Sequence, residues 1–168
     1  RDYKGTFAGS KLLNLGFPGD GTQNVLWRIQ HGALDGISPK LVTLLIGTNN
    51  LGPAKGLHTP DKPDDVFAGI QAIVAEVRTR LPESKLMVFS IFPRGPQAAN
   101  ERVMAVNAML PQLTDQKHVF HVDINATFLD DQGQQIDAYY NKAGVHLLPA
   151  GYAAWAKSLQ PLLENEGL

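Results

Sequence analysis

One run of residues, 41–46, most constrains what this chain can fold into. It consists of leucine, valine, isoleucine and a single threonine, a composition typical of a strand in a parallel sheet that is buried on both faces. The predicted strand, residues 40–46, stops at a Gly-Thr-Asn-Asn motif, so that an amide side chain follows its carboxyl end. Open α/β sheets build their sites at that edge. The sequence therefore predicts an α/β fold with Asn49 close to a site.

Strand and helix patterns alternate along the rest of the chain. Short apolar stretches predict three further strands, at residues 11–15, 85–92 and 118–124. Apolar residues at three- and four-residue steps predict four helices: one from about residue 22 to 34, one opened by Pro63, one around Val103 that bends or ends near Pro111, and one from about 149 to 163. This alternation favours a doubly wound α/β fold with a parallel sheet. A chain of 168 residues, 43% of them hydrophobic, is expected to form a single domain, residues 1–168.

Composition excludes several kinds of function. A formal charge of −1 with 18% charged residues offers no basic surface for nucleic acid, and no apolar run is long enough to span a membrane. The chain has no cysteine, which excludes thiol catalysis and Cys-ligated zinc within it. The compartment stays open between cytosol, periplasm and exterior, with the latter two favoured. Neither a cofactor nor a metal is expected, and His118 and His121 with Asp123 are the one weak alternative.

Two further loops are candidates for part of a site, as the Asn49 loop is. Residues 16–22 form a glycine-rich turn at the start of a predicted helix, where Gly19 lets the backbone turn tightly and Asp20 is expected to cap the helix. Taken singly, Gly19 is an ordinary turn residue and Asn49 closes its own Asx-turn. Taken together, just past the carboxyl ends of two predicted strands, they favour a pair of hydrogen-bond donors for a developing oxyanion.

The third loop carries His146. It follows a long polar loop and precedes a helix started by Pro149, which is where a general base can face a cleft. A lone histidine is more often structural or solvated than catalytic. The chain's other histidines lie late in the first helix, in the Gly/Pro-rich loop and at the last strand: His31, His58, His118 and His121. His146 is therefore the candidate base.

The order glycine turn, asparagine turn, late histidine resembles three of the four sequence blocks of the SGNH (GDSL-type) hydrolases. Residues 13–28, LNLGFPGDGTQNVLWR, are similar to the second block of a branch that includes the brain-type platelet-activating-factor acetylhydrolases and bacterial carbohydrate acetylesterases. Further matching positions extend the similarity over nearly the whole chain: His31-Gly32, Leu34, Pro39-Lys40 and Pro93-Arg94-Gly95.

The resemblance implies a fold and a reaction. The fold is a flavodoxin-like three-layer sandwich with a five-stranded parallel sheet of order 2-1-3-4-5. The reaction is ester hydrolysis through an acyl-serine, with release of a small acyl group such as acetate, and a carbohydrate O-acetylesterase is the leading hypothesis. By the same resemblance, the Gly19 N–H and the Asn49 amide belong to the oxyanion hole and His146 is the general base.

This sequence departs from the family pattern at two points. The Gly-Asp-Ser block that carries the nucleophile has no counterpart, and none of the serines follows a strand in a nucleophile-type turn: Ser10, Ser38, Ser84, Ser90 and Ser158. The family's acid usually stands three residues before the histidine, and Ala143 occupies that position. Asp137 is expected to orient His146 only if the loop folds over.

The missing block also has a structural consequence. In the order 2-1-3-4-5 the strand that carries the nucleophile lies between residues 11–15 and 40–46, so its absence leaves both neighbours with unpaired backbone groups. We therefore expect a partner: an N-terminal segment of the same domain, on a separate chain or separated by an inserted domain, that supplies this strand and the serine. The expected substrate is an acylated small molecule or carbohydrate. The alternatives are a non-catalytic relic that acts as a binding or scaffold module, and a phospholipid acetylhydrolase.

Overall fold

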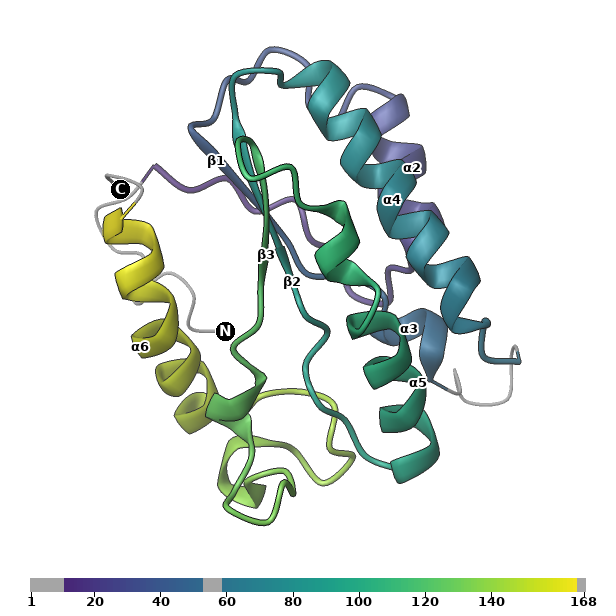
Figure 1. Ribbon diagram of the computed structural model, residues 1–168, viewed down its shortest axis with the longest axis vertical. Helices are drawn as coiled ribbons and strands as arrows, with labels where there is room; N and C mark the ends of the chain where they lie inside the picture. The colour runs from purple at the N-terminus through teal and green to yellow at the C-terminus, as the bar shows by residue number, and fades with distance from the viewer. Residues whose placement is uncertain (1–10, 53–58, 166–168) are drawn as a thin grey trace.

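The computed structural model describes residues 11–52 and 59–165 (Figure 1). Three strands, β1 (Leu41–Leu44), β2 (Lys85–Phe89) and β3 (Val119–Val122), form a sheet of order β1-β2-β3 in which both pairs are parallel. The predicted α/β fold with a parallel sheet is confirmed. The order of these strands is that of the last three in the expected 2-1-3-4-5 sheet.

Helices cover both faces of this sheet. Figure 1 shows α2 (Thr22–Gln30), α4 (Pro63–Arg80) and α5 (Gln97–Asn107) on one face and α6 (Pro149–Asn165) on the other. Four shorter helices complete the described fold: α3 (Thr48–Leu51), η1 (Leu110–Leu113), η2 (Asn125–Phe128) and η3 (Asp137–Tyr139). The arrangement is three layers, helices on either side of a sheet.

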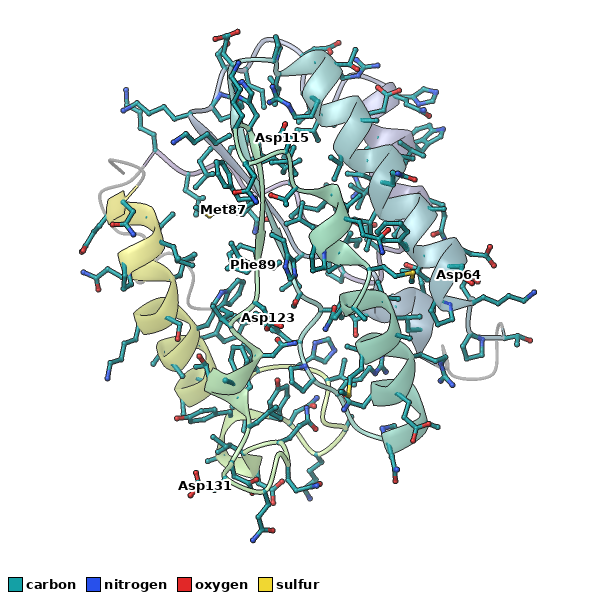
Figure 2. The ribbon with its side chains drawn as sticks, in the orientation of Figure 1. Asp64, Met87, Phe89, Asp115, Asp123 and Asp131 are labelled. Atoms are coloured by element: carbon teal, nitrogen blue, oxygen red, sulfur yellow. The ribbon has the colours of Figure 1, made fainter. Side chains whose placement is uncertain are left out.

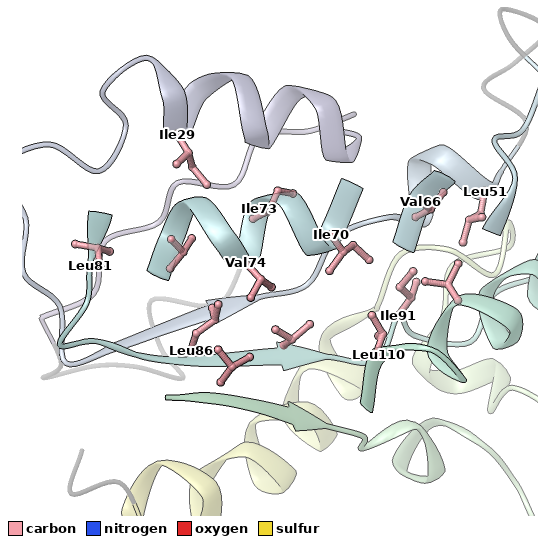
Figure 3. Packing of buried hydrophobic residues seen from close by; sticks show 14 of the residues in the cluster. Ile29, Leu51, Val66, Ile70, Ile73, Val74, Leu81, Leu86, Ile91 and Leu110 are labelled. Carbon is pink, nitrogen blue, oxygen red and sulfur yellow. The ribbon is translucent and has the colours of Figure 1, made fainter. Parts of the chain in front are cut away.

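The two faces of β2 are buried in different clusters. Leu86 and Val88 pack with aliphatic residues of α4 and α5, such as Ile70 and Val106, in the larger cluster, part of which Figure 3 shows. Met87 and Phe89 point to the other side, where Phe89 and Leu159 of α6 belong to a second cluster (Figure 2). Successive side chains of a strand alternate between faces, so a central strand with helices on both sides must be apolar throughout.

The predicted strand at residues 11–15 is wrong within the described structure. These residues belong to no strand, and Leu12 and Leu13 are 51% and 58% exposed. Their backbone contacts are local, as where Gly16 N donates to Asn14 Oδ1 at 2.9 Å. A short apolar run becomes a strand only when a neighbouring strand accepts its hydrogen bonds, and no described strand lies beside this one.

Of the strand predicted at residues 40–46, the structure forms β1 at Leu41–Leu44, and it is half-buried rather than fully buried. Within the described residues β1 pairs only with β2, and Thr43 is exposed while Leu41, Val42 and Leu44 are partly covered. The first helix also ends earlier than predicted, at Gln30, because Gly32 turns the chain with a φ of 93°. The α5 helix ends at Asn107, before Pro111, as the sequence indicates.

Candidate active site

The carboxyl ends of the three strands lie at one edge of the sheet, and each leads into a candidate loop (Figure 1). β1 leads into α3, β2 into the Pro93-Arg94-Gly95 turn, and β3 into η2 and the long loop that reaches His146. Figure 2 marks this edge with Asp123, just after β3. The loops singled out in the sequence therefore follow strands that end together.

The glycine turn has the backbone that the sequence predicts. Gly19 has a φ of 84°, in the left-handed region that favours glycine, and a Cβ there would meet no atom within 4 Å. The turn is fixed to α2 by an ion pair between Asp20 and Arg28, and this hydrogen bond raises the pKa of Arg28. Arg28 also lies over the Phe17 ring, 4.6 Å from its centre.

The predicted capping role of Asp20 is wrong. The helix N-cap is Gly21, whose N–H donates to Asn24 Oδ1 at 2.9 Å. The carboxylate of Asp20 instead pairs with Arg28 and accepts a hydrogen bond from Phe17 N at 3.3 Å. The Arg28 guanidinium, nearly two helical turns into α2, offers this carboxylate a full opposite charge, whereas a backbone N–H offers only a dipole.

Asn49 is joined directly to the glycine turn. Its Nδ2 donates to the backbone carbonyl of Asp20 at 2.9 Å, and its side chain is half-buried. The amide therefore spans two loops and does not close an Asx-turn of its own. A side-chain amide has two N–H donors, and the described residues supply an acceptor for one of them. The second N–H can serve a ligand oxygen.

The neighbouring Asn50 is a residue that the sequence reasoning missed. It is only 4% exposed, its Oδ1 accepts from Thr22 N at 3.0 Å, and its Nδ2 donates to Asp61 Oδ2 at 2.8 Å and to Gln23 Oε1 at 3.0 Å. Its signal in the sequence is weak, because Asn49-Asn50 offers two identical side chains and nothing local tells which one turns inward.

Arginines hold α3 from the α5 side. Arg94 is 9% exposed, and its Nη1 donates to the carbonyl and the hydroxyl of Thr48, the latter at 3.1 Å. Arg102 donates from Nε to the carbonyl of Leu51 at 2.9 Å. The guanidinium of Arg94 lies so close to the Cα of Gly52 that a Cβ there would overlap it. Burial lowers the pKa of Arg94, with a smaller effect from Arg102.

The His146 loop is tied to the turn after β2. Gly95 N donates to the carbonyl of Gly144 at 3.0 Å, and Gln135 Nε2 donates to the carbonyls of Pro93 at 2.7 Å and Gly144 at 3.1 Å. Arg94 in turn contacts Thr48, beside Asn49. A continuous set of hydrogen bonds thus links the three loops at this edge.

The side chain of His146 is exposed and its backbone is held in place. Asn141 N donates to its carbonyl at 2.9 Å, and its own N–H donates to Asn141 Oδ1 at 3.3 Å. Among the described residues no carboxylate hydrogen-bonds to the imidazole. Asp137 begins η3 without such a contact, and Ala143 is exposed.

A serine–histidine pair does exist elsewhere in the described chain. Ser90 Oγ and His121 Nε2 are 2.9 Å apart, but Ser90 is only 1% exposed, so no substrate can reach its hydroxyl. Burial lowers the pKa of His121, while Asp123 raises it less strongly. A buried pair of this kind satisfies two polar side chains in the interior.

The remaining candidates have structural roles or lie outside the described residues. His31 stacks on Trp27 with ring centres 4.2 Å apart, at the C-terminal end of α2, and His58 falls in the undescribed segment 53–58. Residues 11–52 and 59–165 contain no group of three His, Asp or Glu side chains arranged to hold a metal. In the same ranges, no helix is both long and apolar enough to cross a bilayer.

Comparison with known proteins shows the family of this chain. The model of the GDSL-like lipase/acylhydrolase family matches residues 2–154. Platelet-activating factor acetylhydrolase IB subunit alpha1 of Pongo abelii is 34% identical over 164 residues, which cover 96% of this chain and 67% of that protein.

Solved structures share the fold. A structure described as a platelet activating factor from Streptococcus pneumonia has a TM-score of 0.80 and 27% identity, and covers 95% of this chain and 76% of its own. An acetyl-xylooligosaccharide esterase from Geobacillus Stearmophilus has a TM-score of 0.71 at 18% identity, over 93% of this chain and 72% of its own, and shows the fold alone. Matched over almost its whole length, the chain belongs to the GDSL-like lipase/acylhydrolase family.

Proposed function

We propose that this chain is the larger part of a serine-type ester hydrolase that removes a small acyl group, such as acetyl, from a carbohydrate. The observation that carries the proposal is the 2.9 Å hydrogen bond from Asn49 Nδ2 to the carbonyl of Asp20, which joins an amide donor to the Gly19 turn. Membership of a lipase/acylhydrolase family and a fold shared with an acetyl-xylooligosaccharide esterase support it.

The proposed reaction divides hydrolysis into two steps. His146 takes the proton of a serine hydroxyl as the serine oxygen attacks the ester carbonyl, and the Gly19 N–H and the Asn49 amide donate to the resulting oxyanion. The intermediate collapses to an acyl-serine as the imidazolium returns its proton to the departing alcohol. Water, activated by His146, then releases the carboxylic acid and restores the serine.

The serine would come from the nucleophile segment, our name for a segment outside residues 1–168 that carries the Gly-Asp-Ser block and the first strand of the sheet. Within the described residues, β1 has a strand on one side only. Leu12, Leu13, Leu15 and Phe17, in the segment expected on the far side of the missing strand, are exposed. A strand inserted there would pair with β1 and cover these apolar side chains.

Residues 1–168 are expected not to unfold as a cooperative monomer when expressed alone. Without the nucleophile segment, the unpaired edge of β1 and the exposed leucines leave backbone and apolar groups unsatisfied. Urea titration followed by tryptophan fluorescence and circular dichroism, with size-exclusion chromatography, tests this. The two probes should disagree or the chain should self-associate, whereas addition of the segment should give one coincident transition. A monomeric, two-state chain without the segment would contradict the prediction.

An acid introduced at position 143 is expected to raise activity. Ala143→Asp would set a carboxylate three residues before His146, where it can fix the productive tautomer of the imidazole. The intact protein should then show a higher kcat on a small acetyl ester. Ala143→Asn, which adds similar bulk without the charge, is the control. If another group already orients the ring, both variants will match the unsubstituted protein.

A second candidate function, a phospholipid acetylhydrolase, is favoured by the 34% identity to a platelet-activating factor acetylhydrolase subunit. Initial rates of the intact protein on acetylated xylo-oligosaccharide and on an acetylated ether phospholipid discriminate the two. A kcat/KM that favours the sugar ester supports the first proposal, and the reverse preference replaces it. If the intact protein has no nucleophile segment and hydrolyses neither ester, the chain is a non-catalytic relic of the family.

A further inference from the structure

We propose that Asn50, through Asp61, is a positioning residue that sets the spacing between the two halves of the oxyanion hole. The inference rests on the proposed function, because the hole is the site that it deepens. Asn50 does not face the substrate in this proposal. It acts on Asn49 and on the glycine turn, which it holds at a fixed separation.

The carbonyl side of the Asn50 amide controls the start of α2. Its Oδ1 accepts from Thr22 N at 3.0 Å, and Thr22 lies three residues after Gly19. The first N–H groups of a helix have no partner within the helix, so a side chain from another element that binds one fixes where the helix begins. Thr22 is also packed against Gly69 of α4, so closely that a Cβ at position 69 would overlap the threonine hydroxyl.

The amino side of the same amide fixes α3 to the start of α4. Asn50 Nδ2 donates to Asp61 Oδ2 at 2.8 Å, and Asp61 N returns a hydrogen bond to the carbonyl of Asn50 at 2.9 Å. A four-residue helix cannot hold itself in place, because helix nucleation is unfavourable. The orientation of α3, and with it the direction of the Asn49 amide, therefore depends on contacts such as these.

Asn50 is suited to this role because it must both donate and accept. Thr22 N requires an acceptor, and ionised Asp61 requires a donor. An amide satisfies both, whereas a carboxylate in its place lacks the donor. Gln23, the third partner, can exchange its amide nitrogen and oxygen by rotating the side chain, so it adapts to either kind of neighbour. Asp61 has no such freedom, and the Asn50–Asp61 contact is the one to test.

The test uses Asn50→Asp in the intact protein, nucleophile segment included. The substitution keeps the shape and the acceptor for Thr22 N but brings a second carboxylate to the position now 2.8 Å from Asp61. The repulsion should displace α3, and kcat on a small acetyl ester should fall about 10-fold or more, since a 1 Å misplacement can cost about 100-fold. KM should change much less than kcat.

The pH dependence separates positioning from general damage. Two carboxylates at hydrogen-bond distance share a proton, and their coupled titration lies above the ordinary carboxyl range. At pH values below this titration, one of the two carboxyl groups is protonated and donates a hydrogen bond to the other, which restores the contact between positions 50 and 61. The ratio of kcat for Asn50→Asp to kcat for the unsubstituted protein should therefore rise as the pH falls. A variant whose fold is merely weakened would show no such recovery.

The reciprocal variant Asn50→Asp/Asp61→Asn provides the rescue. It exchanges the amide and the carboxylate, so one donor and one acceptor face each other again. The kcat of the double variant should return toward that of the unsubstituted protein, and the ratio of the two kcat values should not depend on pH. Asn24→Asp is the matched charge control. It adds a carboxylate to α2 but keeps the oxygen that accepts from Gly21 N. The ratio of its kcat to that of the unsubstituted protein should therefore stay independent of pH.

The side-chain amide resonance of Asn49 gives a readout that does not need turnover. In Asn50→Asp it should shift at neutral pH, and it should return on acidification and in the double variant. An active enzyme in which Asn50→Asp changes neither kcat nor this resonance overturns the inference and leaves the proposed function intact. An intact protein that hydrolyses no ester overturns the proposed function, while the resonance still decides whether Asn50 positions Asn49.

Discussion

Replacement of His146 by alanine is expected to abolish nearly all turnover of the intact protein on a small acetyl ester. Without the imidazole, neither the serine proton nor the proton of the departing alcohol has a carrier. Loss of the histidine from a serine hydrolase triad costs up to about 10⁶-fold in kcat, and about 10³- to 10⁴-fold acceleration over water can persist from the oxyanion hole and binding. Steady-state kinetics with an active-site titration of the serine measure the loss.

The matched control is His31→Ala. His31 is also exposed, but it stacks on Trp27 at the end of α2, and its removal should leave kcat nearly unchanged. Thermal unfolding of both variants separates loss of the base from loss of the fold. Turnover that survives His146→Ala would remove His146 from the mechanism. The buried Ser90–His121 pair could not take its place, because Ser90 is 1% exposed.

The second large effect is expected from Asn49→Ala. Loss of one oxyanion donor typically lowers kcat by about 10²- to 10³-fold. The variant also loses the 2.9 Å hydrogen bond to the carbonyl of Asp20, so the glycine turn gains freedom as well. KM should change little, because the donor acts on charge that develops after the substrate has bound.

Asn165→Ala is the control for Asn49→Ala, since Asn165 is an exposed residue at the end of α6. It should keep full activity. Circular dichroism and the midpoint of thermal unfolding check that Asn49→Ala remains folded. Unchanged turnover in Asn49→Ala would exclude the side chain from the oxyanion hole, whatever its hydrogen bonds in the free protein.

The sequence predicted those parts of the fold that depend on local pattern. Short apolar runs become β1 and β2, and the three- to four-residue spacing from Val66 to Val77 becomes the buried face of α4. Residues 11–15 have a similar apolar character but form no strand in the described structure. The difference is the neighbour: a strand forms by pairing, and its pairing partner cannot be read from its own residues.

The candidate site shows the same limit. The positive φ of Gly19 follows from local chemistry, and the contact between Asn49 and the glycine turn agrees with the predicted grouping of two loops at one edge. The α3 helix was missed because contacts from Arg94, Arg102 and Asn50 hold it, and those residues come from distant parts of the chain or point inward without a local signal. The catalytic roles of Gly19, Asn49 and His146 stay predictions.

The close approach of Arg94 to Gly52 has an evolutionary consequence. A side chain at position 52 would meet the guanidinium, the flexible end of Arg94, which would then have to move away. Displacement of the guanidinium would give up its hydrogen bonds to Thr48. Substitutions at positions 52 and 94 are therefore expected to be coupled in evolution.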